Sequence, residues 1–232
     1  MMTDVSSNPV LLVHGFASSF HLNWQDSGLS YLLEDAGREV IGVDLLGHGS
    51  APKPHDPAEY ADLGARVVDV LPTDGRVVDA VGFSMGARTL IEVASAHPER
   101  FDRLVFAGVG DNLFASGDKE PLAHALETGD GGPGGVAALF VSFSQGSGND
   151  PKALAACMRR AEPPITEEQL ARITSPALVV LGDKDFVGKG ERLAEALPNA
   201  QLKYLRGVEH FATPKDFGFI DSVLEFLGAV PR

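Results

Sequence analysis

The sequence predicts an α/β fold with a parallel sheet of about six strands and helices on both faces. Short, almost uninterrupted apolar runs recur along the 232 residues, as expected for strands covered on both faces. Segments with apolar residues at helical spacing separate these runs, which favours right-handed crossover connections. Hydrophobic residues make up 44% of the chain, enough for one substantial core, and no shift in composition marks a second independent domain.

The first predicted strand ends in a glycine-containing loop. Residues 10–13 read VLLV and lead directly into His14, Gly15 and Phe16. Because glycine lets the backbone approach a ligand closely, the Phe16 N–H is a candidate hydrogen-bond donor to an oxyanion. The alternative is an ordinary glycine turn in which the core satisfies His14.

The second predicted strand comprises residues 40–44 and is also expected to be buried. It leads into a tight turn in which two glycines flank His48, and we expect that histidine to be structural. A loop and helix that end at Gly37 separate the first two strands. A helix over residues 60–71 is expected to precede the third strand.

The third strand and the helix after it frame the strongest motif. An apolar run over residues 77–83 leads into Gly82-Phe83-Ser84-Met85-Gly86, and helical spacing follows. A serine between a strand and a helix needs crowded backbone torsions, and the two glycines leave room for them. The Ser84 hydroxyl is then exposed beside the first helical N–H groups, including that of Met85. This arrangement predicts a nucleophile, which requires a base and a group to orient that base.

The regular alternation stops after the strand at residues 104–108. Residues 111–163 contain a glycine-rich connector at 130–135, flanked by helical patterns, and we interpret them as a small helical cap. The predicted domain organisation is therefore a core of residues 1–110 and 164–232 with an insertion of residues 111–163. The cap helices are expected at residues 122–127, 136–143 and 151–161.

The last third of the chain supplies the candidate base and acid. A strand at residues 177–181 leads into Asp183 and Asp185, and a strand at 202–205 leads into His210. Because the carboxyl ends of parallel strands share one edge of a sheet, His210 is expected beside Ser84. Short helices are expected at 167–173 and 191–197, and a C-terminal helix at about 214–227.

Taken together, the chain resembles the α/β-hydrolase superfamily over nearly its whole length. The order nucleophile, acid, histidine is the order of that family. The segments that carry the resemblance are His14-Gly15, Asp44 with residues 47–49, residues 82–86, residues 182–185 and His210.

The resemblance implies roles for individual residues. It assigns Ser84 as nucleophile, His210 as general base, and the Phe16 and Met85 N–H groups as oxyanion hole. It selects Asp185 as the acid, while Asp183 and Asp111 remain open alternatives. The family's N-terminal β-hairpin is expected to be absent, because only about nine residues precede the first strand.

The leading functional hypothesis is a serine hydrolase that cleaves a small carboxylic ester or thioester through an acyl-enzyme. The alternatives are cofactor-free carbon–carbon bond hydrolysis of a diketone-like acid and a non-catalytic binding protein of the same fold. We rank the first alternative lower because the cap offers few cations to a substrate carboxylate. Apolar side chains are expected to form the substrate pocket, namely Phe16, Leu139, Phe140, Phe143 and Phe211.

The amino-acid composition limits the classes of partner that the protein is expected to bind. Nineteen Lys and Arg against 32 Asp and Glu give a net charge of −13, which disfavours nucleic acid and anionic membranes. No secretion signal or membrane-spanning run is apparent, so we expect a cytoplasmic protein. The sequence implies no metal or organic cofactor, and it leaves the oligomeric state open. The single cysteine, Cys157, is expected to be a buried side chain without a catalytic role.

Overall fold

The computed structural model describes residues 7–229, and six parallel strands form its central sheet. The strand order is β2-β1-β3-β4-β5-β6, and every neighbouring pair is parallel, as predicted. The strands are β1 (Val10–Val13), β2 (Val40–Val43), β3 (Val78–Phe83), β4 (Phe101–Ala107), β5 (Ala177–Gly182) and β6 (Ala200–Leu205). The segment before β1, where no hairpin was expected, lies largely in residues 1–6, outside the described residues.

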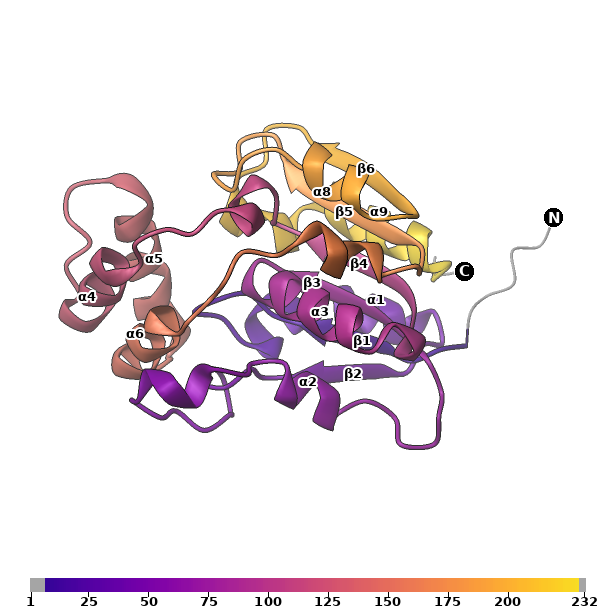
Figure 1. The fold of residues 1–232 in the computed structure, drawn as a ribbon, viewed down its shortest axis with the longest axis horizontal. Helices are drawn as coiled ribbons and strands as arrows, with labels where there is room; N and C mark the ends of the chain where they lie inside the picture. Colours follow the sequence, from indigo (N-terminus) through magenta and orange to yellow (C-terminus); the bar gives the residue numbers. More distant parts are fainter. Residues whose placement is uncertain (1–6, 230–232) are drawn as a thin grey trace.

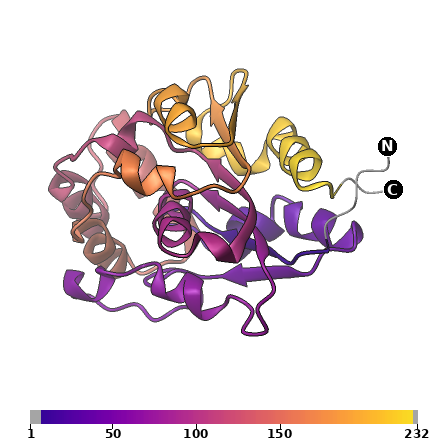
Figure 2. The same ribbon diagram turned by 45° about the vertical axis from the view of Figure 1, so that its right-hand side comes forward.

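Alternate strand residues bury themselves against helices on opposite faces of the sheet. Leu11 and Val13 of β1 join one apolar cluster, whereas Val10 and Leu12 join the other. The first face is covered by α2 (Ala65–Asp69), α3 (Met85–Ala96), α7 (Glu167–Ala171) and α8 (Glu191–Ala196). The second is covered by α1 (Leu29–Asp35) and α9 (Phe217–Leu227). Figure 2 shows α9, in yellow, on the opposite side of the sheet from α3, in magenta.

Three helices lie apart from these layers, beyond the carboxyl ends of the strands (Figure 1). They are α4 (Glu120–Thr128), α5 (Gly135–Ser147) and α6 (Pro151–Arg159). Each corresponds to a helix expected in the cap. The ends follow familiar local rules, since Asp150 caps α6 ahead of Pro151, and Gly129 and Gly148 end α4 and α5 in left-handed conformation. The domain limits at residues 110/111 and 163/164 stay a prediction.

Two predicted helices differ from the observed elements. Residues 60–71 are not one helix, because a 3₁₀ turn, η2 (Pro57–Tyr60), is separated from α2 by four residues. The Tyr60 side chain is buried and donates a hydrogen bond to the Pro54 carbonyl, which turns the chain before α2 starts. The C-terminal helix begins at Phe217 and not at 214, because Asp216 caps it after the 3₁₀ segment η5 (His210–Lys215).

The edge strand β2 is less buried than expected. Val43 is buried, but Val40 and Ile41 are half-buried and Gly42 is exposed. An apolar run predicts a strand without revealing its place in the sheet, and an edge strand has a neighbour on only one side. The central strands β1 and β3 are fully buried, and Phe16 and Ser84 follow their carboxyl ends.

Candidate active site

Ser84 lies in a strained turn between β3 and α3. Its backbone has φ 53° and ψ −115°, a conformation that few non-glycine residues adopt. A Cβ at Gly82 would lie 2.6 Å from the Ala87 Cα, and a Cβ at Gly86 would overlap the Val13 carbonyl oxygen. The two glycines therefore supply the space that this turn requires, which is the role predicted from their spacing.

His210 lies between Ser84 and Asp185 and contacts both. Its Nε2 is 2.9 Å from Ser84 Oγ, and its Nδ1 is 2.9 and 2.8 Å from the two Asp185 carboxylate oxygens. The side chains of His210 and Asp185 are 2% and 0% exposed, whereas Ser84 is only half-buried. A neutral imidazole with its proton on Nδ1 donates to Asp185 and accepts from the serine hydroxyl. This geometry can activate a hydroxyl for attack.

The two competing carboxylates point elsewhere. Asp183 Oδ1 accepts a hydrogen bond of 2.6 Å from the Gly207 N–H. Asp111 Oδ2 accepts one of 2.9 Å from the Lys189 N–H. Both residues are exposed, and each stabilises a loop beside the site. Of the three acids left open by the sequence, the structure brings only Asp185 to His210.

Two backbone N–H groups are available near Ser84. Met85 is the first residue of α3, so its N–H has no acceptor within the helix. In the part of the chain that the structure describes, the Phe16 N–H also has no acceptor within the protein. Both residues line the same cavity as Ser84. Their donors are therefore free to bind an oxygen of a ligand.

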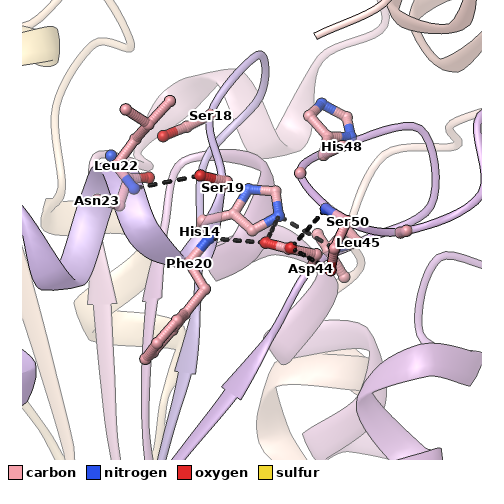
Figure 3. A network of polar contacts seen from close by, with 12 residues as sticks. His14, Ser18, Ser19, Phe20, Leu22, Asn23, Asp44, Leu45, His48 and Ser50 are labelled. Carbon is pink, nitrogen blue, oxygen red and sulfur yellow. Dashed lines mark hydrogen bonds and ion pairs between the residues drawn. The ribbon is translucent and has the colours of Figure 1, made fainter. Parts of the chain in front are cut away.

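The loop that carries Phe16 is fixed by buried polar contacts (Figure 3). His14 is fully buried, its Nε2 accepts a hydrogen bond from the Leu45 N–H at 3.0 Å, and its Nδ1 donates to the Gly15 carbonyl at 2.7 Å. The core thus satisfies His14, which was one of the two alternatives. Burial lowers the pKa of His14, against the opposing effects of the Gly15 hydrogen bond and of Asp44.

Asp44 connects the loop after β1 to the loop after β2. Its carboxylate accepts hydrogen bonds from the Phe20 N–H at 2.8 Å and from the N–H and hydroxyl of Ser50 at 2.7 and 2.8 Å (Figure 3). Burial raises the pKa of Asp44, but these hydrogen bonds and the nearby His14 outweigh it, so the pKa lies below its ordinary value. The neighbouring His48 is fully buried, and burial together with His14 lowers its pKa to about 3.

A cavity of about 240 Å³ opens beside Ser84. Of the five residues predicted to bind substrate, Phe16 and Phe140 line it. Phe143 and Phe211 instead line a second cavity of about 270 Å³, and Leu139 is 51% exposed and lines neither. The assignment of these three residues to the substrate pocket stays a prediction. For Leu139 and Phe143, helical spacing identified apolar residues of the cap without deciding which side of α5 faces Ser84. Phe211 lies in η5, and its ring centroid is 5.1 Å from that of Phe140.

Several residues of the cavity were not singled out from the sequence. Phe186 lies against His210, with ring centroids 4.5 Å apart, and its position directly after Asp185 was the available signal. The wall also contains four charged side chains, and two of these, Lys119 and Arg160, are among the few cations that the sequence places in the cap. The other two charged residues are Arg88 of α3 and Glu162. Four uncharged residues that the sequence did not single out also line the cavity, namely Val109, Asn112, Leu113 and Val187.

Glu162 is surrounded by the three cations. Its carboxylate is 2.8 Å from Lys119 Nζ and 3.3 Å from Arg88 Nε, and it contacts an Arg160 terminal nitrogen. Burial alone would raise the pKa of Glu162, but the charges of Arg160, Arg88 and Lys119 lower it below its ordinary value. The carboxylate is therefore ionised at neutral pH.

Cys157 is fully buried, and its Sγ lies 3.9 Å from Met85 Sδ and 3.6 Å from an Arg160 terminal nitrogen. Burial raises the pKa of its thiol to about 11, so the thiol stays protonated. Within residues 7–229, no cluster of three or more His, Cys, Asp or Glu side chains is arranged to hold a metal ion. No helix in that stretch combines the length and the apolar character that a membrane span needs.

Comparison with known sequences agrees with the geometry. A family model described as the alpha/beta hydrolase fold matches residues 8–142, more than half of the chain. The 2-hydroxymuconate semialdehyde hydrolase of Pseudomonas putida is 31% identical over 124 residues, covering 52% of this chain and 41% of that protein. The pimeloyl-(acyl-carrier protein) methyl ester esterase of Neisseria meningitidis is 27% identical over 232 residues, covering 87% and 85%. The chain spans less than half the length of several curated relatives that it matches.

Solved structures show the same architecture. The enol-lactonase of Burkholderia xenovorans LB400 aligns with 97% of this chain and 94% of its own, with a TM-score of 0.74 and 19% identity. At that identity the likeness shows the fold alone. The family match, the parallel sheet and the strained serine turn after β3 together confirm the resemblance inferred from the sequence, and this chain belongs to the α/β-hydrolase family.

Proposed function

We propose that this protein is a serine hydrolase that cleaves a small carboxylic ester or thioester through an acyl-enzyme intermediate. The observation that carries the proposal is the position of His210, whose two ring nitrogens contact Ser84 Oγ and the Asp185 carboxylate at 2.8 to 2.9 Å. The family match and the similarity to the methyl ester esterase support the reaction class.

In the proposed first step, Ser84 Oγ attacks the ester carbonyl carbon while His210 Nε2 takes the hydroxyl proton. The carbonyl π electrons move onto oxygen, and the Phe16 and Met85 N–H groups stabilise the resulting oxyanion. Asp185 accepts from Nδ1–H, which keeps Nε2 free as a base and stabilises the imidazolium. Collapse of the intermediate breaks the bond to the leaving alkoxide or thiolate, which takes the proton from Nε2.

In the second step, water replaces the departed alcohol or thiol. His210 Nε2 removes a proton from that water as its oxygen attacks the acyl carbon, and the same N–H groups hold the second oxyanion. Breaking the bond to Ser84 Oγ releases the carboxylic acid, and the proton on Nε2 returns to the serine. The net reaction converts the ester or thioester and one water into a carboxylic acid and an alcohol or thiol, and it returns Ser84 and His210 to their starting protonation states.

The dimensions of the cavity support a small substrate. Its volume of about 240 Å³ lies below the roughly 300–1,000 Å³ that is typical for drug-sized ligands. Apolar side chains such as Leu122, Phe140 and Met158 supply much of the wall. We therefore expect acyl chains of about four to six carbons to be favoured over long fatty acyl chains, because added methylenes gain affinity only until the cavity is full.

Carbon–carbon bond hydrolysis of a diketone-like acid remains the second candidate. It ranked lower on sequence grounds because few cations were expected near the substrate. The lining of the cavity by Arg88, Lys119 and Arg160 now favours it more, as does the similarity to 2-hydroxymuconate semialdehyde hydrolase. A binding protein without turnover is the least supported alternative, because His210 contacts both Ser84 and Asp185.

The proposal is tested by labelling the purified protein with a fluorophosphonate probe and by assaying methyl butyrate hydrolysis in a pH-stat. We expect a covalent adduct on Ser84 alone, and a loss of activity of at least about 10⁴-fold in Ser84→Ala, because no other group replaces the attacking hydroxyl. Ser116→Ala, a change at an exposed serine, serves as the matched control and should behave like the wild type. Equal labelling of the Ser84→Ala protein would refute the proposal.

A further inference from the structure

The cavity beside Ser84 has an excess of positive charge, in contrast to the net charge of −13 of the whole chain. Arg88 comes from α3, whereas Lys119 and Arg160 adjoin the ends of the cap helices α4 and α6. Among the residues that the structure describes, Glu162 supplies the only carboxylate in the same wall. Three segments that are distant in sequence thus bring three cations to one small space.

The carboxylates that form ion pairs with these cations are fewer than the cations. Within residues 7–229, the ion pairs of Arg88, Lys119 and Arg160 involve only Glu162 and Glu92. Glu92 contacts Arg88 at 3.2 Å, does not line the cavity, and has a side chain that is 39% exposed. Even with both carboxylates ionised, one positive charge remains without a counterion from the protein.

One donor in the wall also lacks a proper acceptor. The Arg88 side chain is only 7% exposed, and its Nε forms no hydrogen bond with the protein, although Glu162 lies 3.3 Å away. A buried guanidinium N–H without an acceptor is unfavourable, and a ligand oxygen could satisfy it. Burial lowers the pKa of Lys119 against the effect of Glu162, and the positive charges of Arg160 and Arg88 lower it further. An added anion would accept a hydrogen bond from Arg88 Nε and would favour the charged form of Lys119.

We propose that this wall binds a carboxylate of the substrate, so that the preferred ester is a monoanion with a free carboxylate on its acyl side. The inference rests on the proposed esterase function and adds the substrate class. A single carboxylate matches the one uncompensated charge, and its two oxygens suit the fixed donors of a guanidinium. The half ester of a short dicarboxylic acid carries both an ester and a free carboxylate, and it is small enough for a cavity of about 240 Å³.

The test measures binding without turnover. Monomethyl glutarate and its neutral counterpart of similar length, methyl valerate, are titrated calorimetrically into the Ser84→Ala protein. We expect monomethyl glutarate to bind about ten- to a hundredfold more tightly, the range expected for charge-assisted hydrogen bonds. Equal affinities would overturn the proposal.

Variants of Lys119 locate the binding site. Lys119→Gln in the same background should lower the affinity for monomethyl glutarate at least tenfold, and Lys119→Arg should largely restore it. Lys119 is 30% exposed, so both changes are expected to fold. Lys152→Gln removes the same charge from an exposed position of α6 outside the cavity and should leave binding unchanged.

The outcomes separate this inference from the esterase proposal. If Lys119→Gln lowers the unfolding temperature but not the affinity, the cations only hold the cap against α3, and the carboxylate site is refuted. If the binding results hold but no fluorophosphonate adduct forms on Ser84, the esterase proposal fails and the anion site stands. If labelling succeeds and the carboxylate gives no advantage in binding, the esterase proposal stands alone.

Discussion

At the scale of single residues, Asp185 is distinguished from its neighbours by what it contacts. Asp183 and Asp185 are separated by one residue in the same turn, yet only Asp185 reaches the His210 ring. The Asp185 N–H donates to the Gly182 carbonyl, and its Oδ1 also accepts from the Val187 N–H at 3.1 Å. The turn after β5 therefore fixes the direction of this carboxylate before any ligand binds.

We predict that Asp185→Asn lowers kcat for a small ester by about 10⁴-fold. The same substitution in a well-studied serine protease has an effect of about this size, because it changes the tautomer of the histidine. The amide is neutral and cannot stabilise an imidazolium. Asp183→Asn and Asp111→Asn are matched controls, since each removes one carboxylate from a nearby loop. The kcat of these two variants should stay within about tenfold of the wild-type value. A loss in Asp111→Asn as large as that expected for Asp185→Asn would assign the orienting carboxylate to Asp111 instead.

At the scale of elements, the connection between α5 and α6 is attached to the loop that carries Phe16. Asn149 is 8% exposed and makes three hydrogen bonds to backbone groups of other loops. Its Oδ1 accepts from the Gly49 N–H at 2.8 Å, and its Nδ2 donates to the Ala17 and Ser18 carbonyls at 3.0 Å. Ala17 itself has a φ of 58°, which is unusual for a residue with a Cβ.

We predict that Asn149→Ala destabilises the protein by about 1–3 kcal/mol and also lowers kcat/KM for a small ester about tenfold. The variant leaves buried backbone groups unpaired and loosens the loop next to Phe16. Urea unfolding and ester kinetics measure the two effects. Asn199→Ala is the control, because it removes a hydrogen bond to the Thr174 carbonyl at an exposed position. A stable variant with wild-type kinetics would contradict the proposed coupling.

At the scale of the whole molecule, two buried histidines link folding to pH. His14 and His48 are fully buried, and each has a pKa below its ordinary value chiefly because burial disfavours the charged ring. Below about pH 6.5 the unfolded chain binds protons on these residues and the folded chain does not. Their contribution to stability is therefore present above about pH 6.5 and is lost as the pH falls, for His48 down to about pH 3. The pKa of Asp44 is lowered in the folded protein, so this carboxylate also stabilises the fold. Its contribution to the free energy of unfolding is lost at more acidic pH than the pH at which the histidine contribution begins to fall.

We predict that the free energy of unfolding decreases steadily between pH 7 and pH 4.5, and that His48→Asn reduces this decrease. The asparagine amide can keep a donor near the position of Nδ1, which is 2.9 Å from the Leu46 carbonyl oxygen. The variant is expected to be less stable at pH 7 but less sensitive to acid. Urea titrations at several pH values measure both quantities.

The sequence alone determined the architecture, and its strongest motif predicts the chemistry proposed for the site. The apolar runs of β1, β3, β4 and β5 predict strands because each run is long enough to cross a buried sheet. The spacing of Gly82 and Gly86 around Ser84 predicts the strained turn, since only a residue without a Cβ fits at those positions. These signals are local, so they can be read along the chain.

Only the tertiary structure decided the properties that depend on contacts between distant segments. It distinguishes Asp185 from Asp183 and Asp111, and it separates Phe140, which lines the cavity with Ser84, from Leu139 beside it in sequence. The charged wall is the clearest example, because Arg88, Lys119 and Arg160 are scattered over more than seventy residues and meet at Glu162 only after the cap packs against α3. Helical spacing shows that a residue is apolar or charged, but the packing of elements determines which neighbours it has.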